Sequence, residues 1–115
     1  MSKDCLFCKI AAGEIPAKIV REDDFALAFE DVNPQAPLHV LVIPRRHIAT
    51  LNELADDDEA LVGHLVSMAR DVAHDRGLDG SGYRTVFNCN ADGGQTVFHI
   101  HLHLIGGRSL AWPPG

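Results

Sequence analysis

Three histidines alternate with apolar residues near the C-terminal end of the sequence. In the segment TVFHIHLHLIGG, residues 96–107, His99, His101 and His103 occupy every second position. Residues two apart lie about 7 Å apart on one face of a strand. The pattern therefore predicts a row of imidazoles on one face and a buried face formed by Phe98, Ile100, Leu102 and Leu104. Because the row would span about 13 Å, the three rings cannot all bind one tetrahedral metal ion, and we expect them to have separate roles.

The residues before this row favour phosphate chemistry over the alternatives, a solvated strand face or a hydrolytic zinc site. A solvated face would more often carry lysine, glutamate or threonine. Asn88, Gln95 and the Thr96 hydroxyl flank a turn at Gly93 and Gly94, whose backbone amides we expect to point outward. Donors that converge beside an imidazole are what phosphoryl or nucleotidyl transfer requires. Imidazole can also attack phosphorus and form a covalent intermediate that water later opens.

A second group with possible chemistry is the C-x-x-C pair of Cys5 and Cys8. Such a pair by itself is ambiguous between metal binding and redox chemistry. A thioredoxin-like site would follow a strand in a βαβ unit, and the sequence has none at this point. A structural zinc site would need two further ligands. The alternative is that both cysteines are small buried residues that pack a helix.

Composition limits the class of protein. The 115 residues are enough for one domain, which we place at 1–115. The net charge of -6 argues against a nucleic-acid polymer as partner, although it leaves room for a single phosphate group. No run of 18 apolar residues predicts a membrane span, and the N-terminal segment is too short and too charged for a signal peptide. We therefore expect a cytoplasmic protein with reduced thiols and no membrane partner.

The elements that would position these residues predict an α+β fold. A short helix over residues 5–14 would stop at Gly13, and a longer one would begin at the N-cap Asp56, with Glu59 completing a capping box, and end at Gly77. A flexible glycine turn is expected at 91–95. Strands joined by short turns favour an antiparallel sheet with the helices segregated from it. The expected strands cover 17–23, 24–31, 38–44, 83–90 and 96–105.

Several motifs together resemble the histidine triad (HIT) superfamily, and in particular its Hint branch of nucleoside phosphoramidate hydrolases. The His-x-His-x-His signature is HIHLHLI, and the likeness extends over nearly the whole chain. The further matching segments are EIPAKIV, LAFEDVNPQAP, VIPRRHI, DGGQTVFHIHLHLIGGR and WPPG. The resemblance implies a five-stranded antiparallel sheet with one long and one short helix, and a homodimer in which the C-terminal SLAWPPG reaches towards the partner's site.

The resemblance also implies roles for single residues. His101 matches the nucleophile, His103 the histidine that contacts the phosphate, and His99 the one that supports the site. Asp31 matches the acid that binds the ribose hydroxyls. Thr96 stands where the branch usually has serine, which keeps the hydroxyl that assists the leaving amine and adds a methyl group. The phosphate-binding loop corresponds to Asn88, Gly94, Gln95, Thr96 and Val97, and the apolar clamp on the base to Leu6, Phe7, Phe29 and Val32.

For the cysteines, the resemblance implies a structural zinc ion. Superfamily relatives with this C-x-x-C bind zinc through two histidines that correspond to His47 and His99. Eukaryotic members of the Hint branch generally lack the second cysteine and need no metal. We therefore expect possible structural zinc at Cys5, Cys8, His47 and His99, with no cofactor required for catalysis.

The expected function is hydrolysis of the P–N bond of purine nucleoside 5′-phosphoramidates, through a nucleotidyl-histidine, to the nucleoside monophosphate. Two alternatives stay open at the level of sequence. Other triad branches cleave dinucleoside polyphosphates or transfer nucleotidyl groups. The chain could also be a non-catalytic nucleotide-binding regulator whose dimer surface recruits other proteins.

Overall fold

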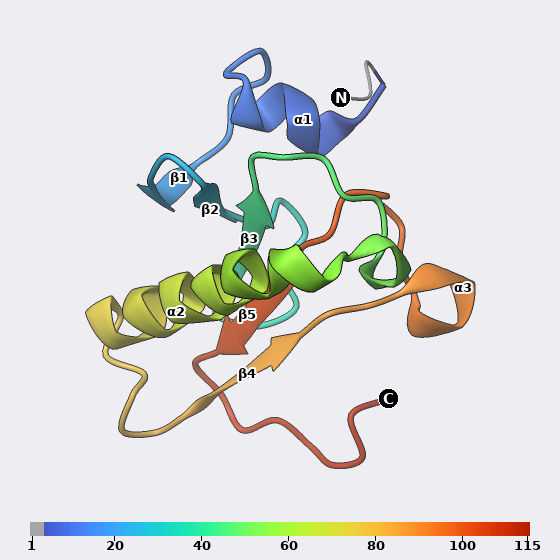
Figure 1. The fold of residues 1–115 in the computed structure, drawn as a ribbon. Helices are drawn as coiled ribbons and strands as arrows, with labels where there is room; N and C mark the ends of the chain where they lie inside the picture. The colour runs from blue at the N-terminus through green and yellow to red at the C-terminus, as the bar shows by residue number, and fades with distance from the viewer. Residues whose placement is uncertain (1–3) are drawn as a thin grey trace.

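The computed structural model describes residues 4–115, in which an antiparallel sheet carries a long helix on one face (Figure 1). Within this part of the chain, five strands pair antiparallel in the spatial order β1-β2-β3-β5-β4. This arrangement confirms the predicted α+β class and sheet. In chain order the elements are α1 (Leu6–Ala11), β1 (Ile19–Glu22), β2 (Ala26–Glu30), β3 (Leu38–Pro44), two 3₁₀ turns (Leu51–Glu53 and Asp56–Asp58), α2 (Glu59–Asp75), β4 (Tyr83–Val86), α3 (Asn90–Gly93) and β5 (Leu102–Gly106).

The central strand β3 separates two apolar clusters because its side chains alternate between the faces of the sheet. Every residue of β3 is buried. On one face Val40 and Val42 pack with the α2 residues Leu65 and Met68. On the other face Leu41 and Ile43 pack with residues of β2 and α1, including Phe7, Cys8 and Phe29. The short helix α1 is thus attached to the face of the sheet opposite α2.

The last strand begins later than the alternation of histidines predicts. We expected a strand over residues 96–105, but β5 covers only Leu102–Gly106. Before it the chain follows an irregular path, in which the Ile100 N–H donates to the Ile48 carbonyl. His99 is fully buried, whereas Phe98, expected on the buried face, is 49% exposed. The prediction of one straight row of three histidines was therefore wrong for its first member.

Two neighbouring predictions also need correction. β4 ends at Val86, whereas the sequence predicted a strand to residue 90. The expected flexible turn at 91–95 is the short helix α3, which Gly94 ends in a left-handed conformation with φ of 83°. The Gln95 side chain holds this segment together, because its Oε1 accepts from the Asn90 N–H at 2.9 Å.

The long helix has the predicted apolar stripe but a different start. Asp56 belongs to a 3₁₀ turn, and α2 begins at Glu59. Asp58, not Asp56, provides the carboxylate at this end: it accepts from the Ala55 N–H at 2.8 Å and pairs with Arg46. The predicted stop at Gly77 is confirmed by its positive φ of 74°. Among the helices of residues 4–115, none has the length and hydrophobicity that a membrane span requires.

Candidate functional site

His101 and His103 lie side by side on the face of the sheet that carries α1. Their ring centroids are 4.9 Å apart. His101 is 7% exposed, and the side chain of His103 is partly buried. The Phe7 ring of α1 packs edge-on against His101, with centroids 5.1 Å apart. An apolar wall therefore lies on one side of the imidazole pair.

A hydrogen bond fixes which nitrogen of His101 carries the proton. Its Nδ1 lies 2.8 Å from the His99 carbonyl oxygen, which can only accept, so Nδ1 donates. Burial lowers the pKa of His101 below the ordinary 6.5, although this hydrogen bond and the Asp31 charge oppose the shift. The ring is consequently neutral at physiological pH, with a lone pair on Nε2. This is the form that can attack an electrophile.

A chain of hydrogen bonds assigns the opposite tautomer to His103. The Gln35 N–H donates to His39 Nδ1 at 3.0 Å, so the proton of neutral His39 is on Nε2. That Nε2 lies 2.9 Å from His103 Nδ1, which therefore accepts, and 3.4 Å from the Asp31 carboxylate. The proton of His103 is then on Nε2, a buried atom with no hydrogen-bond partner among residues 4–115.

The electrostatics keep both of these imidazoles uncharged. Burial lowers the pKa of His39 below 6.5, with the Asp31 carboxylate acting in the opposite direction. Burial, followed by the neighbouring His101 and His39, lowers the pKa of His103 to about 4. A neutral His103 with an unpaired Nε2–H is a hydrogen-bond donor in search of an acceptor. An anionic oxygen placed between the two rings would meet a nucleophile on one side and a donor on the other.

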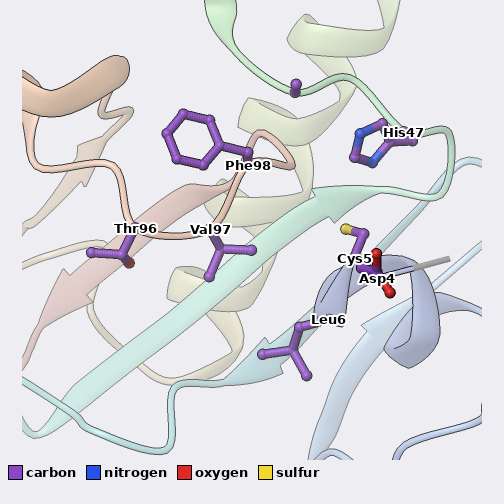
Figure 2. A pocket seen from close by; sticks show the side chains of 8 residues that line it. Asp4, Cys5, Leu6, His47, Thr96, Val97 and Phe98 are labelled. Carbon is purple, nitrogen blue, oxygen red and sulfur yellow. The ribbon is translucent and has the colours of Figure 1, made fainter. Parts of the chain in front are cut away.

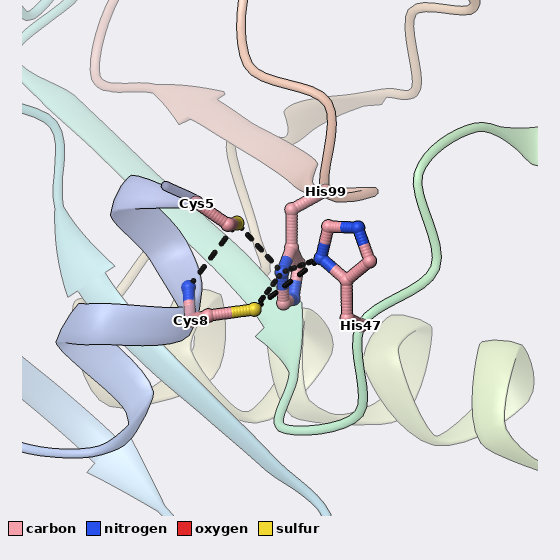
Figure 3. A group of neighbouring side chains, drawn as sticks. All are labelled: Cys5, Cys8, His47 and His99. Carbon is pink, nitrogen blue, oxygen red and sulfur yellow. Dashed lines mark hydrogen bonds between the residues drawn. The ribbon is translucent and has the colours of Figure 1, made fainter. Parts of the chain in front are cut away.

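The His99 ring points towards Cys5, Cys8 and His47 (Figure 3). Its Nε2 lies 2.8 Å from the Pro44 carbonyl and must donate to it, which leaves the lone pair on Nδ1. That Nδ1 is 3.4 Å from Cys5 Sγ, 3.5 Å from Cys8 Sγ and 3.3 Å from His47 Nδ1. His47 Nδ1 is also 3.3 Å from Cys8 Sγ. Residues from α1, the loop after β3 and the segment before β5 thus converge on one point.

The four donor atoms fit a tetrahedral metal ion. Zinc bonds of about 2.3 Å to sulfur and 2.0–2.1 Å to nitrogen imply ligand separations of roughly 3.5 Å for S···N and 3.3 Å for N···N. The observed S···N separations of 3.3–3.5 Å and the N···N separation of 3.3 Å agree with these values. The hydrogen bond from His99 to Pro44 is the kind of outer contact that orients a metal-bound histidine. Cys5, Cys8, His47 and His99 can therefore hold a metal ion.

Helix α1 connects this cluster to the imidazole pair. Cys5 and Cys8 flank Leu6 and Phe7, and Cys5 also caps the helix by accepting from the Cys8 N–H at 3.3 Å. The Phe7 ring contacts His99 and His101 with centroid distances of 6.1 and 5.1 Å. A change at the cysteines would consequently reach the residue that packs on His101.

The predicted phosphate loop has fewer open donors than expected. The backbone N–H groups of Gly94 and Gln95 donate to the carbonyls of Ala91 and Asn90, both at 3.0 Å, so the expectation that the glycine turn offers them outward was wrong for Gly94. The Gln95 side chain is buried and donates to the Ala49 and Val97 carbonyls. These internal bonds satisfy the Gly94 and Gln95 N–H groups and the Gln95 side chain, so none of these groups is an open donor. Thr96 is exposed, and Asn88 is half-buried.

The predicted base clamp divides into two kinds of residue. Phe7 and Phe29 are each 4% exposed and pack edge-on with centroids 5.5 Å apart. Leu6 and Val32 are exposed, at 45% and 100%. Asp31 lies at the end of β2, where one carboxylate oxygen accepts from the Asn33 N–H at 2.9 Å, as a turn-capping residue would. Its other oxygen faces His39, so Asp31 belongs to the imidazole cluster as well.

His39 also belongs to the imidazole cluster. A histidine in an apolar strand is typical of a hydrogen-bonded structural residue, and the bonds to Gln35 and His103 agree with that interpretation. In the structure Asp31, His39 and His103 bring their polar atoms within 4.8 Å of one another. A lone histidine in an otherwise apolar, fully buried strand was the available signal.

Comparison with known proteins agrees with this geometry. Residues 12–110 match the HIT domain family. The chain is 57% identical over 115 residues to an uncharacterized HIT-like protein of Synechococcus elongatus, covering 100% of both. It is 44% identical over 110 residues to the purine nucleoside phosphoramidase of Escherichia coli, covering 96% of this chain and 92% of that protein.

Solved structures give the same result. A HIT family hydrolase from Legionella pneumophila superposes with a TM-score of 0.96 at 57% identity, covering 97% of this chain and 100% of that one. A histidine triad protein from Clostridium difficile superposes with a TM-score of 0.94 at 44% identity, covering 96% of each chain. The chain therefore belongs to the HIT family and has a Hint-like sequence. The C-x-x-C pair lies before the matched residues 12–110, in α1.

Proposed function

We propose that the protein hydrolyses purine nucleoside 5′-phosphoramidates, with His101 as the nucleophile. The observation that carries the proposal is the pair of complementary tautomers, a lone pair on His101 Nε2 and a proton on His103 Nε2. A relative at 44% identity is named for this activity. Nucleophile and donor are both needed when an anionic phosphorus centre is attacked.

The proposed reaction has two steps. First, the lone pair of His101 Nε2 forms a bond to the α-phosphorus while the P–N bond breaks. The amine leaves with the electron pair of the P–N bond. It takes a proton, for which the Thr96 hydroxyl is the proposed donor. Then a water molecule attacks phosphorus, the bond to Nε2 breaks, and the monophosphate leaves as the ring returns to its neutral form. The water supplies the oxygen, one of its protons restores the Thr96 hydroxyl, and the other passes to solvent.

The surrounding residues have supporting roles in this proposal. The His99 carbonyl, which accepts the Nδ1–H of His101 at 2.8 Å, stabilises the positive charge that the ring gains on attack. His103 donates to a non-bridging phosphate oxygen. Asp31 binds the ribose hydroxyls, and the base packs against the exposed Leu6 and Val32 above Phe7 and Phe29. The proposed phosphate loop comprises Asn88, Gly94, Gln95, Thr96 and Val97.

We further propose that the metal at Cys5, Cys8, His47 and His99 is zinc with a structural role. Two thiolates and two neutral imidazoles form a closed tetrahedral set of the kind that structural zinc takes. When bound, the ion would tie α1 to the chain before β5. No catalytic step in this proposal passes through the metal.

The homodimer and the cytoplasmic location also stay proposals. The C-terminal Trp112 is 81% exposed in the single chain, which supports a tail that packs on a partner. Gel filtration at micromolar concentration tests the dimer, and a monomeric elution volume would contradict it.

The test of the function is relative turnover of two substrates. Adenosine 5′-phosphoramidate should be hydrolysed with a kcat/KM well above that for a diadenosine polyphosphate, and the reverse order would favour polyphosphate cleavage. His101→Ala should abolish turnover of the phosphoramidate while AMP still binds. Absence of turnover by the unaltered protein, with AMP binding intact, would favour the non-catalytic regulator.

A further inference from the structure

The cysteine cluster, formed by Cys5, Cys8, His47 and His99, has one thiol that is easier to approach than the other. Cys5 lines a pocket together with Asp4 and His47 (Figure 2). The relative exposure of Cys5 is 8%, against 2% for Cys8, and Cys8 does not belong to the described lining of the pocket. A small solute that enters the pocket therefore meets Cys5 first.

The two sulfurs are close enough to be joined. Cys5 Sγ accepts a hydrogen bond from the Cys8 N–H at 3.3 Å, so it already lies at the first turn of α1. All four donor atoms of the cluster lie within 4.8 Å of one another, the two sulfurs included. Residues three apart in a helical turn have Cα atoms about 5 Å apart, which is in the range that disulfides span. Rotation of the two side chains can therefore bring the sulfurs to bonding distance without a change in the backbone.

The same two sulfurs are oxidisable groups and metal ligands. A thiol that coordinates a metal is deprotonated, and the thiolate is the form that peroxides oxidise. The other two ligands, His47 and His99, do not complete a closed tetrahedral site without the sulfurs. Oxidation of the cysteines consequently removes the metal site.

We propose that Cys5 and Cys8 form a redox switch, in which a peroxide converts the metal site into a disulfide and the ion is released. The inference goes beyond the proposed hydrolysis and rests on the metal site proposed above. In a reducing compartment such a disulfide is transient, which is typical of redox sensing.

The proposed oxidation has two steps. The Cys5 thiolate attacks one oxygen of hydrogen peroxide, the O–O bond breaks, and Cys5 becomes a sulfenic acid while hydroxide leaves. The Cys8 thiolate then attacks the Cys5 sulfur, the S–S bond forms, and the S–O bond breaks with loss of a second hydroxide. The two thiolates give up two electrons, which reduce the peroxide to two hydroxide ions. Since a disulfide offers no thiolate ligand, the metal ion passes to solvent.

The switch acts on the nucleotide site through α1. Phe7 lies between the two cysteines, and its ring contacts His99 and His101 with centroid distances of 6.1 and 5.1 Å. Once the ion is released, the start of α1 loses its link to the loop after β3 and to the segment before β5. The end of α1 keeps its anchor, because Arg45 Nη1 donates to the Ala11 carbonyl at 3.0 Å. Oxidation therefore loosens the packing on His101 without detaching the helix.

Peroxide treatment of the zinc-loaded protein tests the switch. The test uses Cys89→Ser, because Cys5 and Cys8 are then the only thiols and Cys89 lies outside the cluster. A coloured chelator measures the released zinc, and peptide mass spectrometry after alkylation measures the thiols and the disulfide. We expect one zinc ion released per chain and a disulfide between Cys5 and Cys8. Reductant and added zinc should restore the thiols and the metal content.

Retention of zinc after excess peroxide, with both thiols still open to alkylation, would overturn the switch. Failure of the purified protein to hold zinc, even when zinc is added, would instead overturn the structural metal site. Neither measurement depends on phosphoramidate turnover, so loss of the proposed hydrolase would be seen separately.

Single-serine variants test which thiol the peroxide meets first. Cys5→Ser and Cys8→Ser are made in the Cys89→Ser protein and compared without metal, after circular dichroism has shown that both are folded. Because Cys5 lines the pocket, dimedone should trap its sulfenic acid in Cys8→Ser about 5-fold or more faster than it traps Cys8 in Cys5→Ser. Equal or faster trapping at Cys8 would contradict the assignment of Cys5 as the attacked thiol. The zinc-release measurement needs neither variant.

Titration calorimetry with AMP tests the link to the nucleotide site. Oxidised Cys89→Ser should bind AMP with a Kd about 5-fold higher than that of the reduced, zinc-loaded form, the lower end of typical coupling between sites. Reductant and zinc should restore the affinity. The matched control adds Cys5→Ser and Cys8→Ser to Cys89→Ser, and peroxide should leave its AMP affinity unchanged. A disulfide that forms while the AMP affinity stays the same would overturn the regulatory part of the proposal.

Discussion

The molecule contains two histidine clusters that use the same side chain in opposite ways. In the cysteine cluster, His99 donates through Nε2 to Pro44, and its Nδ1 faces three other donor atoms. In the imidazole cluster, the hydrogen bonds run from Gln35 through His39 to His103 and end at a buried Nε2 that has no partner within residues 4–115. The first arrangement is complete once a metal ion is bound. The second still needs an acceptor, which a substrate can supply.

In each of these rings, the hydrogen bond made by one nitrogen determines what the other nitrogen can do. A backbone carbonyl at His99 and at His101 fixes one nitrogen as a donor and leaves the other with a lone pair. For His99 that lone pair is directed at thiols, and for His101 it is directed at the site beside His103. In the proposed function, these two histidines, two residues apart, therefore have a structural and a chemical task.

The largest expected effect concerns the cysteine cluster. Replacing Cys5 and Cys8 by serine should remove the metal and lower the melting temperature by on the order of 10 °C or more, because the binding energy of structural zinc contributes directly to folding. Thermal unfolding followed by circular dichroism, with metal analysis of the purified protein, measures both quantities. A strong chelator should destabilise the unaltered protein and have no further effect on the double variant.

Cys89→Ser is the control, since Cys89 is half-buried and lies outside the cluster. It should keep the metal content of the unaltered protein. If the purified protein contains no metal and melts at the same temperature with and without added zinc, the cysteine cluster is not a structural metal site. The distinction between a metal-binding and a substrate-binding histidine cluster would then be wrong.

The next effect concerns the hydrogen-bond chain to His103. His39→Leu should reduce kcat by about 10- to 100-fold, because His103 loses the donor that keeps its own proton on Nε2. His39→Gln can both accept from Gln35 and donate to His103, so it should recover most of the rate. Equal losses in both variants would mean that His39 has a packing role only.

A smaller effect tests whether the clusters communicate through α1. Removing the metal should raise the Kd for AMP by about 5-fold, the lower end of typical coupling between sites, because Cys5 and Cys8 flank the clamp residues Leu6 and Phe7. Reciprocity requires AMP to raise metal affinity by the same factor. Titration calorimetry of both ligands measures the two factors, and the absence of any change in either affinity would show that the two clusters are not coupled energetically.

The smallest expected effect is on the pH dependence of stability. The pKa of His103 is lowered to about 4 in the folded chain, against 6.5 for an ordinary histidine. The unfolded state therefore binds more protons than the folded state between these two pH values. The contribution of neutral His103 to the free energy of unfolding is complete above pH 6.5 and is lost as the pH falls towards 4. Urea unfolding at pH 7.5, 6 and 5 should show a smaller decline for His103→Gln than for the unaltered protein. Equal declines in the free energy of unfolding of the two proteins would contradict the lowered pKa of His103.

Much of the fold could be predicted because its signals are local. The bounds of β3, residues 38–44, were predicted to the residue, since a continuous apolar run with Pro44 at its end has few other interpretations. The hairpin of β1 and β2 and the stop of α2 at Gly77 also follow from short stretches of sequence.

The errors occur where distant partners override a local pattern. Alternation predicted that residues 96–101 form a strand, but His99 is drawn into a cluster with Cys5, which lies 94 positions away. The contact of His39 with His103 could not be predicted, because the two residues lie 64 positions apart on different strands. Local spacing contains no information on such contacts. The motif-based resemblance identified the family and grouped Cys5, Cys8, His47 and His99, which periodicity could not do.

The central claim is that His101 attacks phosphorus through Nε2, and trapping the intermediate tests it most directly. Adenosine 5′-phosphoramidate is mixed with excess protein, quenched in base within milliseconds to seconds, digested and examined by mass spectrometry. We predict one nucleoside monophosphoryl group on the peptide that contains His101, absent in His101→Ala and still formed, more slowly, in His103→Gln. Turnover with no adduct at any time point, or an adduct on another residue, would contradict the account.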